Sequence, residues 1–564
     1  MKTYKVREGV PEEIHQELAV YPEFLRELLF FRGLDNKEKA EIFLNPSYND
    51  HTHDPLGILG MEKSVERILK AIKNNEVICI YSDYDHDGIP GGVILHDFFK
   101  KIGYANFINY IPHRYLEGYG LNAKAVETLA EEQKVTLLVT VDCGITDAEP
   151  VKRANELGID VIISDHHLPN GKLPEAYAIL NSKQENCDYA YDMLCGAAVA
   201  FKLVQALIAR GNFSEKISPG WEKWLLDLVG LSTIGDMVPL TGENRVLAHY
   251  GLKVLRKSPR PGLLKLMRLM NMKQRFLTED DVAFMLVPRI NAASRMSDPR
   301  LAFNMLSASE EESEPLAKEL HKLNDIRKGK VASMVKEMKH TLSQKDSIPP
   351  VIVMGNPHWQ PGLLGLAAMN LVGEHNRPVF LWGREGGENL KGSCRSNGSA
   401  NVMALMTEVR REIFTDFGGH AYSGGFAVSP LFIHELETEL NRAYGKVRDE
   451  TFEEVSYIDK KLSLEDVSMP TWRHLEKLAP FGVGNEKPLF LFENIVPEKT
   501  RMFGKTKEHL EITFRKTNGD FVRAIEFFSG REIKENEKIS LVASMENSTF
   551  GQYPEIRLRI VDVL

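Results

Sequence analysis

The feature that most constrains the fold is a repeated pattern between about Glu76 and Asp236, where short β-branched runs alternate with amphipathic helical segments. The runs VICIYSD, TLLVTVDCG and DVIISDHH are separated by segments such as VILHDFFKKIG and AEPVKRANELG. Strands separated by helices of this length require right-handed crossovers, which place the strands parallel in one sheet. The pattern therefore predicts an α/β domain built on a parallel sheet.

Each of these runs ends in carboxylate or imidazole side chains, and ligands bind at the carboxyl edge of open parallel sheets. The first run is followed by Asp83, Asp85 and Asp87 at alternate positions. Alternate residues of an extended backbone share a face, so these like charges repel one another unless a cation neutralises them. For this motif alone, a surface Asp-Gly turn with solvated acids is an equal alternative.

Three further element ends carry groups of the same kind. Asp142 follows TLLVTV, His166 and His167 follow DVIISD, and Asp236 follows the apolar stretch that ends in STIG. Carboxylate oxygens mixed with imidazole favour Mn²⁺ or Mg²⁺ over a thiolate-bound zinc. A lone His or Asp is more often structural than a ligand, but such groups at four successive element ends predict a metal site.

Length and composition limit the class of protein. A chain of 564 residues exceeds one hydrophobic core, and about 150 residues per domain suggests roughly three to four domains. The formal charge of −9 argues, taken alone, against a protein that coats nucleic acid. Five cysteines without Cys-x-x-Cys spacing favour neither a disulfide framework nor a thiolate zinc site, so we expect a reducing cytoplasm. The sequence has neither the apolar N-terminal core of a signal peptide nor an apolar run of about 18 residues that could span a membrane. We therefore expect that the protein is neither exported nor embedded in a membrane.

Beyond the first α/β region the pattern changes. Apolar residues recur at helical spacing from about Ser313 to Leu342, which predicts one long helix with Pro315 in its first turn. PPVIVMGNP then begins a second α/β region that runs to about Lys446, with RPVFLWG and GGFAVSP as further strands. From about Asp449 the runs EITFR, VRAIEFF, ISLVASM and EIRLRIVDV predict a small antiparallel barrel, of which an OB-type fold is one kind.

The segments SDYDHDG, VTVDCG, SDHH and TIGDMVPL resemble, in this order, the successive motifs of the DHH phosphoesterase superfamily. IPHRYLEGYGL, PRINAASRM, KGSCRS, GGHAYSGG and LAPFGVGN resemble stretches of the RecJ family of bacterial single-strand-specific 5′→3′ DNA exonucleases. Together they cover most of the chain from about Ile78 to Asn485. The resemblance implies an N-terminal helical extension (1–70), a parallel-sheet DHH phosphoesterase domain (71–310), a connecting helix (311–345), a second α/β, DHH-associated domain (346–448) and a C-terminal OB-like β-barrel (449–564).

The resemblance also implies a set of metal ligands. Two Mn²⁺ or Mg²⁺ ions would be held by four carboxylates and one imidazole, with Asp142 as the bridge: Asp83, Asp85, Asp142, His166 and Asp236. The catalytic groups would be Asp85, Asp142, His166 and His167, and His167 would support a ligand or face the substrate. Asp87 has two open roles, as a metal ligand or as a residue that fixes the loop or begins the next helix as its N-cap. Two-metal hydrolysis activates water and stabilises the charge on the phosphorus oxygens without a protein nucleophile.

Substrate contacts are implied in both α/β regions. Arginine groups are suited to gripping a terminal phosphate, and the implied contacts to the strand are Arg114, Arg289, Asn291, Arg295, Ser393, Arg395 and His420. The alternative for each arginine is an ordinary surface or interdomain salt bridge. For His420 the assignment depends on the resemblance, since Gly418-Gly419 before it is also compatible with a tight turn before a strand.

Two other features are compatible with DNA binding. The block from Gly251 to Arg275 contains eight Lys and Arg residues and no acid; it is either a solvated helical face or a local phosphate-binding surface. In the barrel, Phe481, Phe503 and Phe514 are candidates for stacking on bases, although core packing is the more common role.

The resulting hypothesis is a metal-dependent exonuclease that hydrolyses single-stranded DNA 5′→3′ to mononucleotides, in recombination and repair. The alternatives are a small-substrate DHH phosphoesterase, acting on short oligonucleotides, cyclic dinucleotides or pyrophosphate, and a non-catalytic DNA-binding replisome scaffold. We expect a cytoplasmic monomer whose substrate is single-stranded DNA with a 5′ end and whose further partners are a helicase and a single-strand-binding protein.

Overall fold

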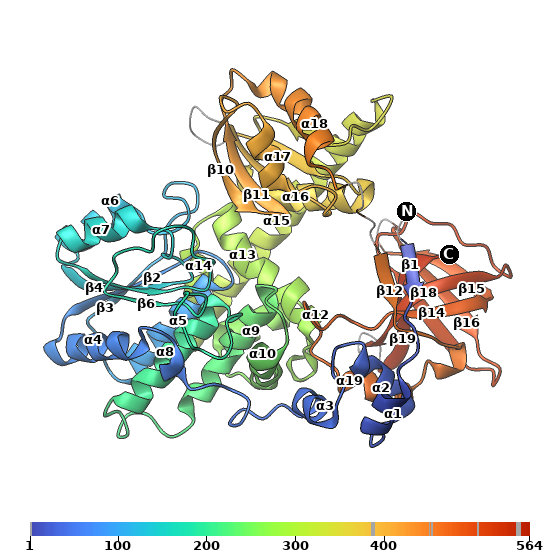
Figure 1. The fold of residues 1–564 in the computed structure, drawn as a ribbon, viewed down its shortest axis with the longest axis horizontal. Coiled ribbons are helices and arrows are strands. Elements are labelled where there is room, and N and C mark those ends of the chain that lie inside the picture. The colour runs from blue at the N-terminus through green and yellow to red at the C-terminus, as the bar shows by residue number, and fades with distance from the viewer. Residues whose placement is uncertain (1–2, 385–389, 450–451, 453–454, 505–506, 549–553) are drawn as a thin grey trace.

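The computed structural model describes residues 3–384, 390–449, 452, 455–504, 507–548 and 554–564. Figure 1 shows three bodies around a common centre: a first lobe on the left, a second lobe at the top and a C-terminal barrel on the right. Within the described residues, no helix combines the length and the apolar character needed to cross a membrane.

The first lobe is built on a parallel sheet with the strand order β3-β2-β4-β5-β6. The strands are β2 (Val77–Ser82), β3 (Phe107–Tyr110), β4 (Val135–Val141), β5 (Asp160–Ser164) and β6 (Ala178–Leu180). The helices are α4 (Met61–Asn74), α5 (Gly88–Lys101), α6 (Ala123–Glu131), α7 (Ala148–Glu156), α8 (Gly196–Arg210), η2 (Trp221–Leu225), α9 (Leu226–Gly235), α10 (Gly242–Leu255), α11 (Pro261–Leu269), α12 (Glu279–Asp281), η4 (Val282–Leu286), α13 (Val287–Met296) and α14 (Arg300–Ser307). The three runs that predicted the sheet are β2, β4 and β5, so the predicted fold class is confirmed.

Two of the helices of the first lobe that are apolar on nearly all sides, and are therefore buried, are α5 and α8. α5 buries ten of its fourteen residues and α8 buries eleven of its fifteen. α5 begins directly after the loop that leaves β2, and α8 packs against α5 in the same core. The N-terminal ends of both helices therefore face the carboxyl edge of the sheet, where the polar residues gather.

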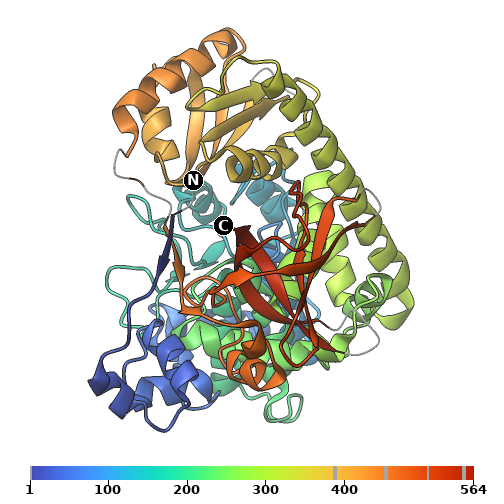
Figure 2. The same ribbon diagram turned by 90° about the vertical axis from the view of Figure 1, so that its right-hand side faces the viewer.

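The long helix α15 spans Glu310–Ser343 and runs from the first lobe to the second (Figure 2). It begins three residues before the predicted Ser313, because Ser309 and Glu312 form a capping box that stabilises the free N–H groups of the first turn. Pro315 consequently lies in the second turn and not in the first. A proline there removes one backbone hydrogen bond, which the long helix tolerates.

The second lobe has a mixed sheet of order β10-β11-β9-β8-β7. Its elements are β7 (Ile352–Gly355), α16 (Pro361–His375), β8 (Val379–Gly383), β9 (Leu390–Arg395), α17 (Val402–Glu408), β10 (Phe414–His420), β11 (Ser423–Val428) and α18 (Leu436–Val447). Gly418 and Gly419 lie inside β10, opposite Gly425 and Gly424 of β11, so the alternative of a tight turn before a strand is wrong. The turn follows His420 instead.

The C-terminal barrel is a seven-stranded sheet of order β13-β14-β18-β19-β17-β16-β15. Its strands and helix are β13 (Lys460–Lys461), α19 (Met469–Glu476), β14 (Phe490–Ile495), β15 (Pro497–Phe503), β16 (His509–Arg515), β17 (Phe521–Glu526), β18 (Ile539–Ser548) and β19 (Glu555–Val563). Phe481 and Phe514 are buried in its core, as the alternative to base stacking required. Phe503 is half-buried and packs against His509 and Phe527.

The N-terminal residues divide between two bodies. β1 (Thr3–Val6) pairs with β12 (Val455–Ile458), and three short helices pack into the core of the barrel. These helices are α1 (Glu12–Glu17), α2 (Glu23–Phe30) and α3 (Lys37–Leu44). α4, in contrast, packs in the core of the first lobe. The predicted segment 1–70 therefore contributes to two hydrophobic cores, while the domain limits themselves stay predictions.

Candidate metal centre

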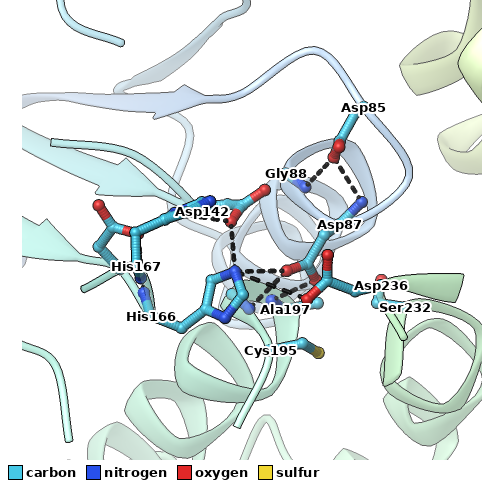
Figure 3. A network of polar contacts seen from close by, with 12 residues as sticks. Asp85, Asp87, Gly88, Asp142, His166, His167, Cys195, Ala197, Ser232 and Asp236 are labelled. Carbon is cyan, nitrogen blue, oxygen red and sulfur yellow. Dashed lines mark hydrogen bonds and ion pairs between the residues drawn. The ribbon is translucent and has the colours of Figure 1, made fainter. Parts of the chain in front are cut away.

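Seven acidic and imidazole side chains meet at the carboxyl edge of the first lobe's sheet, and Figure 3 labels all of them except Asp83. They come from the loop after β2, the ends of β4 and β5, and the end of α9: Asp83, Asp85, Asp87, Asp142, His166, His167 and Asp236. Three overlapping groups have ligand atoms that all lie within 4.8 Å of one another: Asp83 with Asp85 and Asp142, Asp142 with His166 and His167, and Asp87 with His166 and Asp236. The structure thus brings together all five residues predicted as metal ligands.

His166 lies at the middle of this cluster. Its Nε2 atom is 3.2 Å from Asp142 Oδ1, 3.6 Å from Asp87 Oδ2 and 3.7 Å from Asp236 Oδ2. Burial lowers the pKa of His166 below its ordinary value, which favours the neutral imidazole. The neutral form is the one that binds metal ions.

Asp85 and Asp87 also organise the helices around the centre. Asp85 Oδ1 accepts hydrogen bonds from the N–H groups of Asp87 and Gly88, which begin α5. Asp87 stands at the N-cap position of α5, but its carboxylate accepts from the N–H groups of Gly196 and Ala197 at 2.5 and 2.8 Å. Asp87 therefore caps α8 and not the helix that it precedes, which no local sequence pattern indicates.

The backbone at Asp142 is held in an unusual conformation. Its φ of +63° lies in the left-handed region, which is costly for a residue with a Cβ and is often found at functional sites. Gly196 lies directly against it, since a Cβ at Gly196 would come within 2.6 Å of the Asp142 Cβ. Tyr119 donates its hydroxyl hydrogen to the Asp142 carbonyl at 3.1 Å. These contacts fix the direction of the Asp142 carboxylate.

The electrostatics of the cluster fit a bound cation. Asp83 Oδ1, Asp142 Oδ1 and both ring nitrogens of His166 are buried without a hydrogen-bond partner among the described residues. Burial, followed by the neighbouring carboxylates, raises the pKa of Asp83 and of Asp142 well above the ordinary value. The same causes raise the pKa of Asp236 to about 9. Buried acceptors that repel one another are stabilised by a divalent ion, and the mixture of carboxylate and imidazole suits Mn²⁺ or Mg²⁺.

His167 is oriented by a residue that the sequence analysis did not assign. Its Nδ1 atom lies 2.8 Å from Asp165 Oδ1, and the fully buried Asp165 also accepts from the N–H groups of His166, His167 and Ile145. Burial alone would lower the pKa of His167, but the hydrogen bond to Asp165 and its charge raise it. The sequence signal that could have identified Asp165 was its place in the SDHH motif, at the end of a buried strand, where the predicted metal ligands also lie.

An arginine-rich cavity of about 450 Å³ adjoins the metal centre. Its walls come from both lobes and include Tyr84 and four of the seven predicted substrate residues: Arg114, Arg295, Ser393 and Arg395. Tyr84 stands between Asp83 and Asp85 in the chain, and the Arg114 guanidinium lies 5.0 Å from the centre of its ring. The cavity is therefore continuous with the loop that carries the first carboxylates.

The arginines of this cavity lack acidic partners. Among the described residues, no carboxylate lies within 4 Å of the guanidinium groups of Arg114, Arg295 or Arg395, in contrast to the salt bridges that the alternative interpretation required. Burial first, and then the charges of Arg114 and Arg327, lower the pKa of Arg295 to about 10. Mutual repulsion of buried cations is relieved by an anion, so the cavity is suited to a phosphate.

Three predicted substrate residues lie outside the lining of this cavity. Arg289 donates to the carbonyl of Met285 and to His321 Nδ1 of α15. Asn291 accepts the N–H of His86 through its Oδ1 at 2.9 Å and so supports the loop after β2. His420 is exposed at the end of β10. Their contacts to substrate stay predictions.

Comparison with known proteins agrees with this architecture. Residues 77–233 match the model of the DHH family N-terminal domain, residues 349–446 the DHHA1 domain and residues 458–562 the RecJ OB domain. The matches fall on the first lobe, the second lobe and the barrel, in that order along the chain.

Whole proteins of one family are similar to the chain over most of its length. A single-stranded-DNA-specific exonuclease RecJ of Bacillus subtilis is 34% identical over 98% of this chain and 69% of its own length. The protein of that name from Escherichia coli is 30% identical over 84% of this chain and 83% of its own length. The crystal structure of Thermus thermophilus RecJ in complex with Mn²⁺ aligns with a TM-score of 0.81 at 26% identity, covering 100% of this chain and 79% of that one. These similarities, together with the three domain matches, show that the chain belongs to the RecJ family of single-stranded-DNA-specific exonucleases.

Proposed function

We propose that the chain is a metal-dependent exonuclease that hydrolyses single-stranded DNA from its 5′ end and releases mononucleotides. The observation that carries the proposal is the junction of two sites: a cluster of buried carboxylates and imidazoles, several of whose atoms lack a hydrogen-bond partner among the described residues, adjoins a cavity whose arginines have no carboxylate within 4 Å there. One site suits divalent cations and the other suits the phosphate of a strand end. The activity named for the relatives in the RecJ family supports the same conclusion.

The proposed metal ligands are Asp83, Asp85, Asp142, His166 and Asp236, and Asp142 belongs to two of the three ligand groups. This sharing supports a site in which Asp142 would help to hold both ions. When bound, Mn²⁺ or Mg²⁺ ions supply Lewis acidity and neutralise the negative charge that develops on a phosphodiester during hydrolysis. Asp87 adds a carboxylate to the third group, although both of its oxygens already accept N–H groups of α8.

The residues of the chain supply orientation and proton transfer. Asp165 accepts the Nδ1–H of His167 and so leaves the Nε2 atom of that ring for the substrate. Because the pKa of His167 is raised, the ring carries a proton over a wider pH range and can give it to a departing oxygen. This arrangement supports proton transfer by His167 and metal binding by His166.

The arginine cavity accounts for the proposed direction of cleavage. Arg114 and Arg295 come from the first lobe, whereas Ser393 and Arg395 come from β9 of the second, so both lobes hold a terminal phosphate. A strand held by its 5′ phosphate presents its first phosphodiester to the adjoining carboxylates. Cleavage then proceeds 5′→3′.

The remaining assignments belong to the same proposal. The barrel extends the contact with the single strand, a helicase and a single-strand-binding protein deliver DNA, and the enzyme acts as a cytoplasmic monomer in recombination and repair. A monomer is sufficient because residues from both lobes of one chain line the cavity.

The test uses purified protein, Mn²⁺ and strands labelled at either end. We expect release of labelled mononucleotides from 5′-phosphorylated single strands, slow release from duplex, and no release by Asp142→Ala. Arg395→Gln should raise KM for 5′-phosphorylated strands about tenfold and leave kcat nearly unchanged, because it removes one charged contact to the end. Equal turnover of a dinucleotide and a long strand would instead favour a small-substrate phosphoesterase, and equal activity of Asp142→Ala would refute the site.

A further inference from the structure

The motif LAPFGVGN forms a closed turn, residues 478–485, which precedes β14 and is here named the barrel turn. Two backbone hydrogen bonds join Gly482 and Asn485, one in each direction, at 3.0 and 3.1 Å. The amide of Asn485, which is fully buried, donates to the carbonyls of Leu478 and Pro480, both at 2.8 Å. The turn is therefore held in one shape from within, and the function proposed above gives it no role.

Arg245 of α10 anchors the barrel turn on the first lobe. Its buried guanidinium donates to the carbonyls of Lys477, Leu478 and Ala479 at 3.3, 3.0 and 3.3 Å. A buried guanidinium is costly unless its N–H groups are hydrogen-bonded. These bonds therefore hold the start of the turn firmly against α10.

The barrel turn contacts the segment of the first lobe that follows α9. The N–H of Leu240 donates to the carbonyl of Val483 at 2.7 Å. A Cβ at Gly482 would lie 2.7 Å from Leu240 Cδ1, so glycine is what allows this close approach. Leu240 is 1% exposed, and in a close-packed interior its side chain has no free space into which it could turn. A change in the shape of the turn must therefore displace Leu240.

The segment that meets the barrel turn begins at a proposed metal ligand. Asp236 stands at the end of α9, and its carboxylate forms one ligand group with Asp87 and His166 (Figure 3). The next residue, Met237, has a φ of +60°, in the left-handed region, where glycine is the usual residue after a helix. A residue with a Cβ keeps this conformation only where the structure around it enforces it. The direction of the chain at Asp236 therefore depends on what holds the residues that follow.

Both bodies hold the residues that follow Met237. From the first lobe, the side chains of Tyr191 and Asn244 donate to the carbonyl of Pro239 at 3.2 and 3.1 Å. From the barrel, the turn holds the N–H and the side chain of Leu240. Because Leu240 is close to Met237 in the chain, a displacement of the turn is passed through a short stretch of backbone to the bend after α9.

We propose that the barrel turn is a positioning element of the metal centre: it holds Leu240 and, through the bend at Met237, keeps the Asp236 carboxylate in its ligand group. This inference rests on the metal ligands proposed above. It gives the barrel a second role beside contact with the strand, because one ligand group is then complete only when the barrel is docked.

The two halves of the metal centre should consequently respond differently to a displaced turn. The ligand group of Asp83, Asp85 and Asp142 comes from the loop after β2 and the end of β4. Asp236, in contrast, directly precedes the segment that the turn holds. A displaced turn should therefore weaken the binding of one ion and leave the other in place.

A second contact between the two bodies provides a control. Lys487, which follows the barrel turn, pairs with Asp280 of α12, and this pair does not involve the segment after Asp236. Lys487→Met loosens the docking of the barrel without a change at Leu240. If the turn served docking alone, variants at Lys487 and at Gly482 would have the same effect on the metal centre.

The test counts the Mn²⁺ ions bound by the purified full chain without DNA, from the electron paramagnetic resonance signal of free Mn²⁺. We expect two ions in the unchanged protein. The affinity for one of them should fall about threefold in Gly482→Ala and about tenfold in Gly482→Val, because the larger side chain displaces Leu240 further. The other ion should keep its affinity, and so should both ions in Lys487→Met. At saturating Mn²⁺ the Gly482 variants should recover most of their nucleotide release, since every ligand is still present.

Thermal melts and Asp236→Asn separate the two kinds of failure. Each variant should melt cooperatively, and Gly482→Ala, the smaller change, still tests the proposal if Gly482→Val does not fold. Unchanged affinity for both ions in the Gly482 variants, with one ion lost in Asp236→Asn, would overturn the role of the turn. An equal loss in Lys487→Met would also overturn it, because docking alone would then be sufficient. Retention of both ions by Asp236→Asn would instead refute the proposed ligands, and this inference with them.

Discussion

The two ends of α5 hold carboxylates of the same kind in opposite electrostatic settings. At the N-terminal end, Asp83 and Asp142 are buried, repel one another and have no Lys or Arg within 4 Å among the described residues, and their pKa values are raised. At the C-terminal end, Asp97 and Asp227 share the guanidinium of Arg260. The comparison teaches that burial alone does not identify a metal site. The absence of a cationic protein partner does identify it, because a buried charge without such a partner is stable only when a ligand neutralises it.

The largest expected effect is on activity at the unpaired end. Asp142→Asn keeps the size of the side chain but removes the charge shared by two ligand groups. We expect turnover of 5′-labelled single strands to fall by about a thousandfold or more, with no loss of stability in urea, since one source of repulsion is gone. If Asp142→Asn retained a tenth of the activity, the carboxylates at the N-terminal end of α5 would not differ in function from those at its C-terminal end.

The paired end should show the reverse behaviour. Arg260→Met leaves Asp97 and Asp227 without a partner and should lower the free energy of unfolding by about 3–5 kcal/mol, measured in urea. Its matched control is Arg300→Met, because the pair of Arg300 with Asp298 is largely exposed and should contribute about 1 kcal/mol or less. Equal losses in the two variants would show that Arg260 does not stabilise a buried pair.

Stabilisation of the protein by bound Mn²⁺ should depend on the carboxylates at the N-terminal end of α5 and not on those at its C-terminal end. Mn²⁺ at a hundred times its dissociation constant should raise the free energy of unfolding by about 2.7 kcal/mol per site. Chelation by EDTA should reverse the gain, as read from thermal melts. Asp142→Asn should lose most of the gain, whereas Arg260→Met should keep it despite its lower starting stability. A gain of equal size in both variants would place the ion elsewhere.

A further expected effect is a pH dependence of the metal-free protein. The pKa of Asp236 is about 9 in the folded chain, far above that of an unfolded aspartate, so the folded state binds the extra proton. The associated stability is fully present below about pH 4 and is lost as the pH rises through about 9. Urea titrations in EDTA should show this decline, and Asp236→Asn should flatten it. A stability that rises over the same interval would contradict the raised pKa.

The strands that position the metal centre could be predicted from the sequence. The strands β2, β4 and β5 are strongly apolar and end in polar residues, so both their existence and the location of their ligands follow from local pattern. β9 and β10 of the second lobe were not predicted, because LKGSCR and FTDFGGH lack an apolar alternation. Their strand conformation depends on pairing with neighbours, which no local window contains.

Individual contacts could be predicted only between residues that are close together in the sequence. The contact of Arg289 to a phosphate stays a prediction, but its contact with His321 was not foreseen, because it depends on the packing of α13 against α15. For Asp87 one of the two open roles was the N-cap of the helix that follows it, yet it caps a helix more than a hundred residues later. The formal net charge of −9 was a poor guide to nucleic-acid binding, because a sum over the chain does not show where the charges lie in the fold. It averages an acidic cluster and an arginine cavity that lie side by side in the fold.

The docking of the N-terminal helices on the C-terminal barrel has a consequence for biosynthesis. Residues from α1, α2 and α3 complete a core whose other members come from the last hundred residues of the chain. The first lobe can therefore fold while these helices still lack their partner. At a synthesis rate of 5–20 residues per second, that interval is on the order of a minute. Helices α1, α2 and α3 thus reach their final place long after they are synthesised, and a chain cut short before the barrel would leave them without a core.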